Sequence, residues 1–241
     1  MTTTRYPRRH SLRPILLSAF LATVAALQGC ATTQNVVPMS PDDRAALKQA
    51  SVIHVVHCAS PAMNLMTPAS VAGGGLITSA TGSTELPSGA ELERGYSLPN
   101  PAGELSGKLV QRLKAEGRMT NLRVEPRLPQ LPAQLDASSY RGKYPDGLVL
   151  EVTVPYHGAA YKVVNWKTYT YGMFAKARLI RAADAKVLWS DVCVTDDKND
   201  AYRLDVSQFE ANNGAHLKQL FHHASDQCSQ VLADKFLGKA Q

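Results

Sequence analysis

Hydrophobic and polar residues alternate along three stretches in the carboxyl-terminal half of the chain, as they do in strands with one face on a core. The alternation predicts strands over about 148–154, 168–179 and 187–195. Residues 183–186 provide a turn between the last two, which we expect to form an antiparallel hairpin. Two further strands are expected at 51–57, which is apolar on both faces, and at 122–125.

A spacing of three to four residues between apolar positions predicts two long helices. The first spans 101–117, and the second runs from Ala215 to Gly238. A shorter helix is expected over 41–50, with Ser40 as its amino-terminal cap. The apolar stripe of the last helix comprises Leu217, Leu220, Phe221, Ala224, Cys228, Val231, Leu232 and Phe236.

Strands joined through helices and followed by an antiparallel hairpin favour a mixed sheet. We therefore predict a single α+β domain over 41–241, in which the two long helices cover a mixed or antiparallel sheet of about five strands. Residues 59–100 show no sustained period and are predicted to form a flexible insertion. This insertion is either a mobile surface segment or a segment that orders on a partner or on the membrane surface.

The amino terminus has the charge pattern of an export signal. Basic residues and no acid precede the apolar run 15–27, which is shorter than the roughly 20 residues that span a bilayer. The run ends in Leu27-Gln28-Gly29-Cys30, which resembles the lipobox of bacterial lipoproteins. The resemblance implies that residues 1–29 are a signal peptide, that Cys30 carries a membrane-anchoring lipid, and that residues 30–40 form a tether. The other interpretation is a buried helix that ends in a free cysteine.

The lipobox also implies a location at the membrane. Ala31 rather than Asp follows the cysteine, which indicates the periplasmic face of the outer membrane. The formal net charge of +6 belongs mostly to the signal peptide, which carries four arginines and no acid. The remaining chain has 26 − 4 = 22 bases against 20 acids, or +2, so we expect no nucleic-acid partner.

Three further cysteines, Cys58, Cys193 and Cys228, permit three disulfide pairings in an oxidising compartment. We predict the pair of Cys193 and Cys228, because one lies in the last predicted strand and the other on the apolar stripe of the last helix. Cys58, at the end of a buried strand, is expected to be a packed thiol.

Aromatic residues gather in the loop expected between the strands at 148–154 and 168–179. Trp166, Tyr156 and Tyr161 are the candidate binding residues, either as a stacking platform or as an aromatic lid on the end of the sheet. His157 lies in the same loop. Together with Asp146 and Trp166, it defines a possible pocket for a hydrolase or a small-ligand carrier.

No catalytic motif, cofactor-binding motif or metal-binding motif occurs in the sequence. His54 and His57 are three apart in a predicted strand and should point to opposite faces, so they are not expected to share a metal. The acidic loop 196–200 lacks the ligand spacing of a calcium site. We assign no catalytic residue, no cofactor and no metal.

The segments 146–152, 177–181 and 186–190 resemble the α/β domain of curli-secretion lipoproteins and the amino-terminal domain of TolB. In that pattern a buried strand precedes a hairpin of the form "aromatic-x-Ala-Arg-Leu, turn, Val-Leu-Trp-Ser". The resemblance implies an α/β fold within the cell envelope. The expected function is a lipid-anchored, non-catalytic module that binds an envelope protein or assists assembly, and the alternative is the carrier or hydrolase.

Overall fold

The computed structural model describes residues 36–67, 87–128, 136–162, 165–195, 200–209 and 211–239. They form a single α+β domain built on a mixed sheet, so the predicted fold class is confirmed. The sheet has seven strands rather than about five. The two additional strands are short and pair with the far ends of longer ones.

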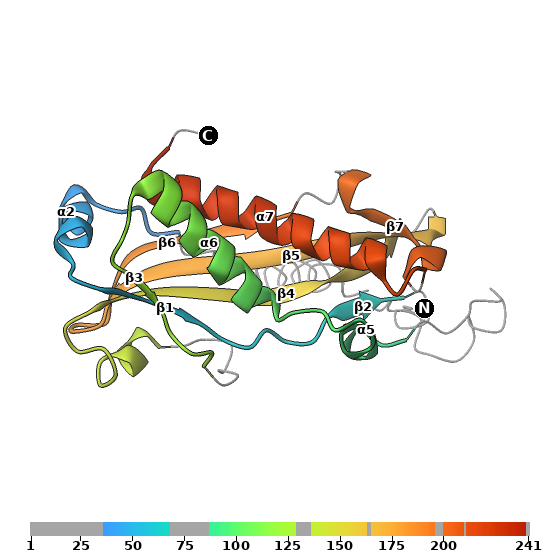
Figure 1. The fold of residues 1–241 in the computed structure, drawn as a ribbon, viewed down its shortest axis with the longest axis horizontal. Coiled ribbons are helices and arrows are strands. Elements are labelled where there is room, and N and C mark those ends of the chain that lie inside the picture. The colour runs from blue at the N-terminus through green and yellow to red at the C-terminus, as the bar shows by residue number, and fades with distance from the viewer. Residues whose placement is uncertain are drawn as a thin grey trace, which may run out of the picture. The chain divides into compact units, whose positions relative to one another are not determined.

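A long antiparallel hairpin of β4 and β5 forms the centre of the sheet, and each outer edge of this hairpin pairs with two strands in succession. β1 and then β2 lie parallel to β4, and β3 lies outside β1. β6 and then β7 lie antiparallel to β5 (Figure 1). The strands are β1 (Ile53–His57), β2 (Asn64–Met66), β3 (Leu122–Val124), β4 (Leu148–Lys162), β5 (Asn165–Arg181), β6 (Lys186–Val194) and β7 (Arg203–Asp205).

The two long helices have nearly the bounds that the apolar spacing predicts. The helices are α2 (Pro41–Gln49), α5 (Gly89–Tyr96), α6 (Pro101–Gly117) and α7 (Ala215–Leu237), with 3-10 turns η2 (Ala137–Tyr140), η3 (Asp200–Tyr202) and η4 (Val206–Gln208). Gly238 ends α7 in the left-handed conformation that glycine adopts without strain. Part of the predicted insertion is regular, because β2 and α5 both fall within 59–100.

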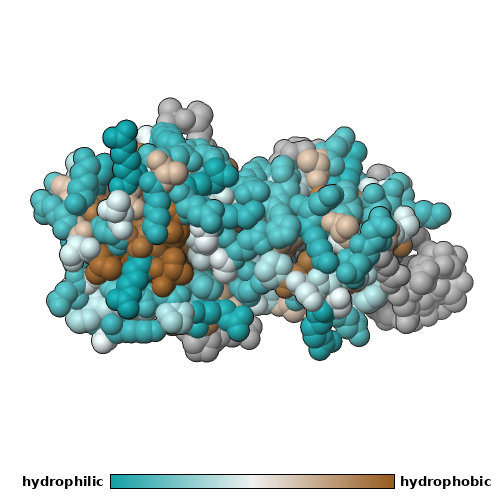
Figure 2. All heavy atoms as spheres, in the orientation of Figure 1, coloured by the Kyte–Doolittle hydropathy of each residue, from teal (hydrophilic) through white to brown (hydrophobic). Residues whose placement is uncertain are grey.

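α6 and α7 run side by side over one face of the sheet (Figure 1) and bury the larger core there. The core-facing positions of both helices are fully buried, including Leu105 and Leu109 of α6 and Phe221 of α7. Figure 2 shows a mostly hydrophilic surface over the helices, with an apolar area on the left between α2 and α6. Burial of the apolar side chains beneath α6 and α7 is the main force that holds these helices on the sheet.

A disulfide joins the sheet to α7. The sulfur atoms of Cys193 on β6 and Cys228 on α7 lie 2.07 Å apart, which is the predicted pairing. Cys58 is free and buried, and burial raises the pKa of its thiol to about 11. The thiol therefore remains protonated and unreactive at neutral pH.

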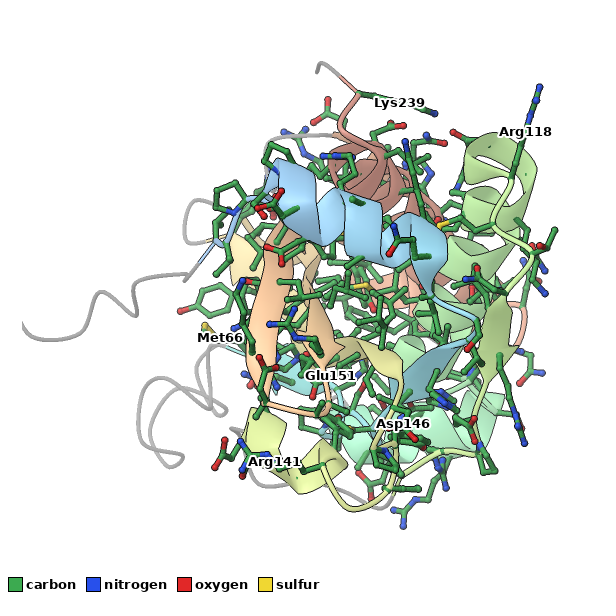
Figure 3. The ribbon with its side chains drawn as sticks, turned by 90° about the vertical axis from the view of Figure 1, so that its left-hand side faces the viewer. Met66, Arg118, Arg141, Asp146, Glu151 and Lys239 are labelled. Atoms are coloured by element: carbon green, nitrogen blue, oxygen red, sulfur yellow. A yellow bond between two sulfur atoms is a disulfide. The ribbon has the colours of Figure 1, made fainter. Side chains whose placement is uncertain are left out.

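The opposite face of the sheet is covered only near β1 by the described residues. Tyr140 and Tyr144, from η2 and the turn after it, pack over Val149 and Ile180 in a second, smaller core. Figure 3 shows Glu151 on the side of the sheet that faces the turn carrying Arg141, away from α6. We call this second face the open face, because the described helices α6 and α7 both lie on the other side.

Candidate functional site

Residues on the open face change from buried to exposed along the β4–β5–β6 part of the sheet. Because side chains alternate between faces, one row across the three strands carries Glu151, Arg178 and Ser190, and a row further on carries Tyr156, Phe174 and Val194. The first row is nearly buried, whereas Tyr156 is 37% exposed and Val194 57% exposed. An exposed apolar row beyond a buried polar row is the first unusual feature of this face.

The buried row is held together by one ion pair. Arg178 donates from Nε to Glu151 Oε1 and from Nη2 to Oε2, both at 2.8 Å. The Tyr140 hydroxyl donates to Glu151 Oε2 at 2.7 Å, and burial together with the Glu151 charge raises the pKa of that tyrosine. All three groups are therefore engaged with one another, and we assign them a structural role.

The predicted His157 site is not formed as expected. His157 lies on β4 rather than in a loop, is 1% exposed and points to the side of the larger core. Its Nε2 is 3.1 Å from the Pro61 carbonyl oxygen and 3.2 Å from Glu93 Oε1 of α5. Through these two contacts, the histidine holds α5 and the segment before β2 against the sheet.

A pocket that joins His157 with Asp146 is excluded by the length of β4. Nine residues separate Leu148, at the start of β4, from His157, which corresponds to about 30 Å of extended strand. Asp146 precedes that strand and so lies at its far end. Trp166 lies within β5, but its side chain is outside the described residues. The expected loop between the two strands is wrong, because β4 extends to Lys162 and β5 begins at Asn165.

A cavity of about 500 Å³ opens beside the exposed row, and its lining includes two predicted binding residues, Tyr156 and Tyr161. The volume is in the range of small-molecule sites, about 300–1,000 Å³. Phe174 and Val194 line it as well. We call it the sheet cavity. Its other lining residues are Ala160, Lys162, Thr170, Tyr171, Gly172, Met173, Thr195 and Arg203.

Small residues account for the sheet cavity. Gly172 of β5 lies directly opposite Gly158 of β4, and Ala160 lies opposite Thr170. A Cβ atom at Gly172 would lie 3.9 Å from Tyr156 Cε1 and 4.0 Å from Thr195 Oγ1, so the glycine leaves room for little more than a methyl group between these two side chains. The absence of side-chain bulk here leaves a depression between the aromatic row and the end of the hairpin.

The polar lining of the sheet cavity consists of hydroxyl groups and cations. Thr170 Oγ1 is buried and makes no hydrogen bond among the described residues. Thr195 Oγ1 accepts a hydrogen bond from the Met173 backbone N–H at 2.9 Å. Lys162 and Arg203 are the charged side chains in the described lining, which contains no carboxylate.

The predicted separation of His54 and His57 is confirmed. His54 Nδ1 is 2.8 Å from Glu125 Oε1, and its ring lies against Tyr144, on the open face. His57 lies on the helix side, where its Nδ1 is 3.5 Å from the Ser106 hydroxyl of α6. Within the described ranges, no group of three His, Cys, Asp or Glu residues is placed to hold a metal ion.

Among the same residues, no helix is long and apolar enough to cross a membrane.

Most of the sheet cavity was not predicted. The aromatic pattern of the sequence pointed to Tyr156 and Tyr161, whereas no pattern pointed to Lys162, Thr170 and Arg203. The available signal was the run Gly158-Ala159-Ala160 between aromatic residues, which is compatible with a strand that leaves room above it.

No protein-family model matches the sequence, and no curated protein matches it. Among solved structures, the chain is similar to the PelC dodecamer from Paraburkholderia phytofirmans at 13% identity and a TM-score of 0.35, covering 80% of this chain and 90% of that one. It is similar to lipoprotein GNA1162 from Neisseria meningitidis at 20% identity and a TM-score of 0.26, covering 69% and 90%. It is also similar to protein XCC0632 from Xanthomonas campestris, of the DUF330 family model, at 12% identity and a TM-score of 0.39, covering 78% and 86%. At these values the similarities carry no argument about function.

Proposed function

We propose that the protein is a lipid-anchored, non-catalytic binding module of the cell envelope, held at the periplasmic face of the outer membrane. The observation that carries the proposal is the open face around the sheet cavity, where Tyr156 and Val194 are exposed beside a hollow of about 500 Å³. Large apolar side chains gathered at a concave surface are typical of recognition sites. The lipobox at Cys30 supports the location.

The contacts of the buried ionisable groups favour binding over catalysis. Glu151 is held by Arg178 and Tyr140, and His157 contacts Pro61 and Glu93. Groups that serve in acid–base catalysis need access to a substrate proton. These side chains instead stabilise the sheet and fasten α5 to it.

The insertion at 59–100 remains part of the proposal. β2 extends the β1 edge of the sheet, and a Cβ at Gly158 would come within 2.0 Å of the Asn64 carbonyl oxygen, so β2 packs tightly on β4. α5 carries Glu93, which contacts His157. Both ends of the segment 68–86 are thus held at the sheet, and this segment itself lies outside the described residues. We propose that it contributes to partner binding.

Two measurements in cells test the proposal. Replacing Cys30 with Ser should move the protein from the membrane fraction to the soluble fraction, because the lipid is its proposed anchor. A photo-crosslinking residue at position 194 should then capture an envelope component in the unaltered lipoprotein. The same residue at position 114, which is exposed on α6, is the matched control. Retention of the Cys30→Ser protein on membranes at high salt, or equal capture from both positions, would refute the proposal.

A further inference from the structure

We propose that the sheet cavity binds an anionic saccharide, with sugar rings against its aromatic side chains and the acidic groups of the sugar at Lys162 and Arg203. This inference rests on the proposed function, since it names the chemical class of an envelope component that the open face would meet. Four properties of the sheet cavity support this inference: its hydroxyl groups, its aromatic rings, its positive charge and the pairing of its backbone.

The hydroxyl groups of the cavity have hydrogen-bonding capacity to spare. Thr170 Oγ1 is buried without a partner among the described residues, and a buried hydroxyl in that state is costly unless something satisfies it. Thr195 Oγ1 accepts one hydrogen bond, from Met173, so its own proton can still be donated. A ligand that carries many hydroxyl groups can both donate to and accept from such side chains.

The aromatic residues offer flat surfaces beside an open floor. Tyr156 and Phe174 lie opposite each other on β4 and β5, and Tyr156 is 37% exposed. Gly172 is two residues from Phe174 on the same face of β5, where a Cβ would just touch Tyr156 Cε1 at 3.9 Å and Thr195 Oγ1 at 4.0 Å. A sugar ring has an apolar face of C–H groups that can pack on an aromatic ring while its hydroxyl groups reach the threonines.

The charge of the described lining selects for an anion. The described lining contains Lys162 and Arg203 and no carboxylate. Arg203 Nη2 is 2.6 Å from Asp200 Oδ1, but Asp200 is 73% exposed, and the guanidinium has further N–H donors. Arginine matches the two oxygens of a carboxylate or phosphate with two parallel hydrogen bonds.

The paired backbone argues against an added peptide strand. Recognition of an extended peptide at a sheet uses unpaired backbone N–H and C=O groups along an edge. Over the cavity, β5 is paired with β4 on one side and with β6 and β7 on the other. Between those two pairings, the Met173 carbonyl oxygen accepts a hydrogen bond of 3.0 Å from the backbone N–H of Thr195. Little of the β5 backbone is thus left for a peptide to pair with, whereas the lining offers side-chain hydroxyls and cations, which favour a saccharide.

Calorimetric titration of the full-length protein, purified from membranes in detergent, tests the inference. The probes are tetragalacturonate, which is acidic, maltotetraose, which is neutral and of equal length, and a hexaglutamate peptide. We expect tetragalacturonate to bind at least about tenfold more tightly than maltotetraose, because charge-assisted hydrogen bonds each contribute about a factor of ten or more. It should also bind more tightly than hexaglutamate, which has the charge but no sugar rings to pack on the aromatic residues. Its affinity should fall when salt is raised from about 0.05 M to about 0.5 M.

Two variants locate the binding site. Gly172→Val places a side chain in the hollow and should abolish binding, whereas Gly107→Val adds the same side chain on α6, where a Cβ meets no atom within 4 Å. Lys162→Ala with Arg203→Ala should weaken binding about tenfold or more. Lys48→Ala with Lys114→Ala, which removes equal charge from exposed helix positions, should leave it unchanged.

Each result decides the matter. Binding of tetragalacturonate that is lost in the cavity variants and kept in their controls supports the inference. No binding, equal binding of the peptide or of maltotetraose, or binding that survives both cavity changes overturns it. The proposed function would still stand if position 194 captured an envelope protein in cells while no saccharide bound, so the two failures are distinguishable.

Discussion

Removing Arg178 should destabilise the protein more than any single change on its surface. Glu151 is 3% exposed, and its carboxylate accepts two hydrogen bonds from Arg178 at 2.8 Å and one from Tyr140 at 2.7 Å. Arg178→Met keeps the length of the side chain but leaves a buried carboxylate with only the tyrosine as partner. Breaking a buried pair in this way costs about 3–5 kcal/mol.

A set of three variants separates the charge from the packing. Tyr140→Phe removes one hydrogen bond to a charged group and should cost about 1.5–3 kcal/mol. Glu151→Leu combined with Arg178→Met removes both charges, so it should recover most of the stability that Arg178→Met alone loses. The free energy of unfolding from urea titration at pH 7 gives each value. A loss below about 1 kcal/mol for Arg178→Met, or a double variant no more stable than that single one, would contradict this account of the open face.

Three other predictions concern separate parts of the fold. Replacing both Cys193 and Cys228 with Ala should lower the free energy of unfolding by about 4 kcal/mol, from the chain entropy of a loop of 35 residues, and peptide mapping without reduction should recover these two cysteines in one crosslinked peptide pair. Replacing His157 with Ala should speed amide hydrogen exchange in α5 more than in α7, because the histidine forms an ion pair with Glu93 of α5. Hydrogen bonds from Arg181 lower the pKa of the Asp184 carboxyl to about 2, so this contribution to stability is present above pH 4 and is lost as pH falls towards 2. Replacing Asp184 with Asn should therefore reduce the urea midpoint at pH 7 and not at pH 2; an equal reduction at both values would contradict this.

The elements that the sequence predicts well are those with a sustained local period. α6 has the predicted bounds, and the alternation around Leu150 and Val152 identifies the first half of β4. The second half of β4 was missed for a physical reason. A β-bulge between Thr153 and Tyr156 shifts the alternation, so that His157 takes the core side and a count of every second residue no longer follows one face.

The remaining differences depend on contacts between distant parts of the chain. β2 is three residues long and exists because it pairs with residues 158–160 of β4. α5 has few apolar residues, but Ser88 and Glu91 form a capping box that was readable in the sequence. The sheet cavity combines Tyr156 with Arg203, which pairs into the sheet from β7, and no local pattern indicates that proximity.

The backbone of Val37 is part of the fold, and this limits how far the sheet could lie from a membrane that held Cys30. Val37 and Ser190 exchange two hydrogen bonds of 2.9 Å, in antiparallel orientation. Only 37 − 30 = 7 residues separate Val37 from Cys30, so a lipid on that cysteine would keep the edge of β6 within about 25 Å of the bilayer surface. Ser190 lies four residues before Val194, at the rim of the sheet cavity, on the same strand. A protein held at this distance would meet molecules rooted in its own membrane before those diffusing in the surrounding fluid.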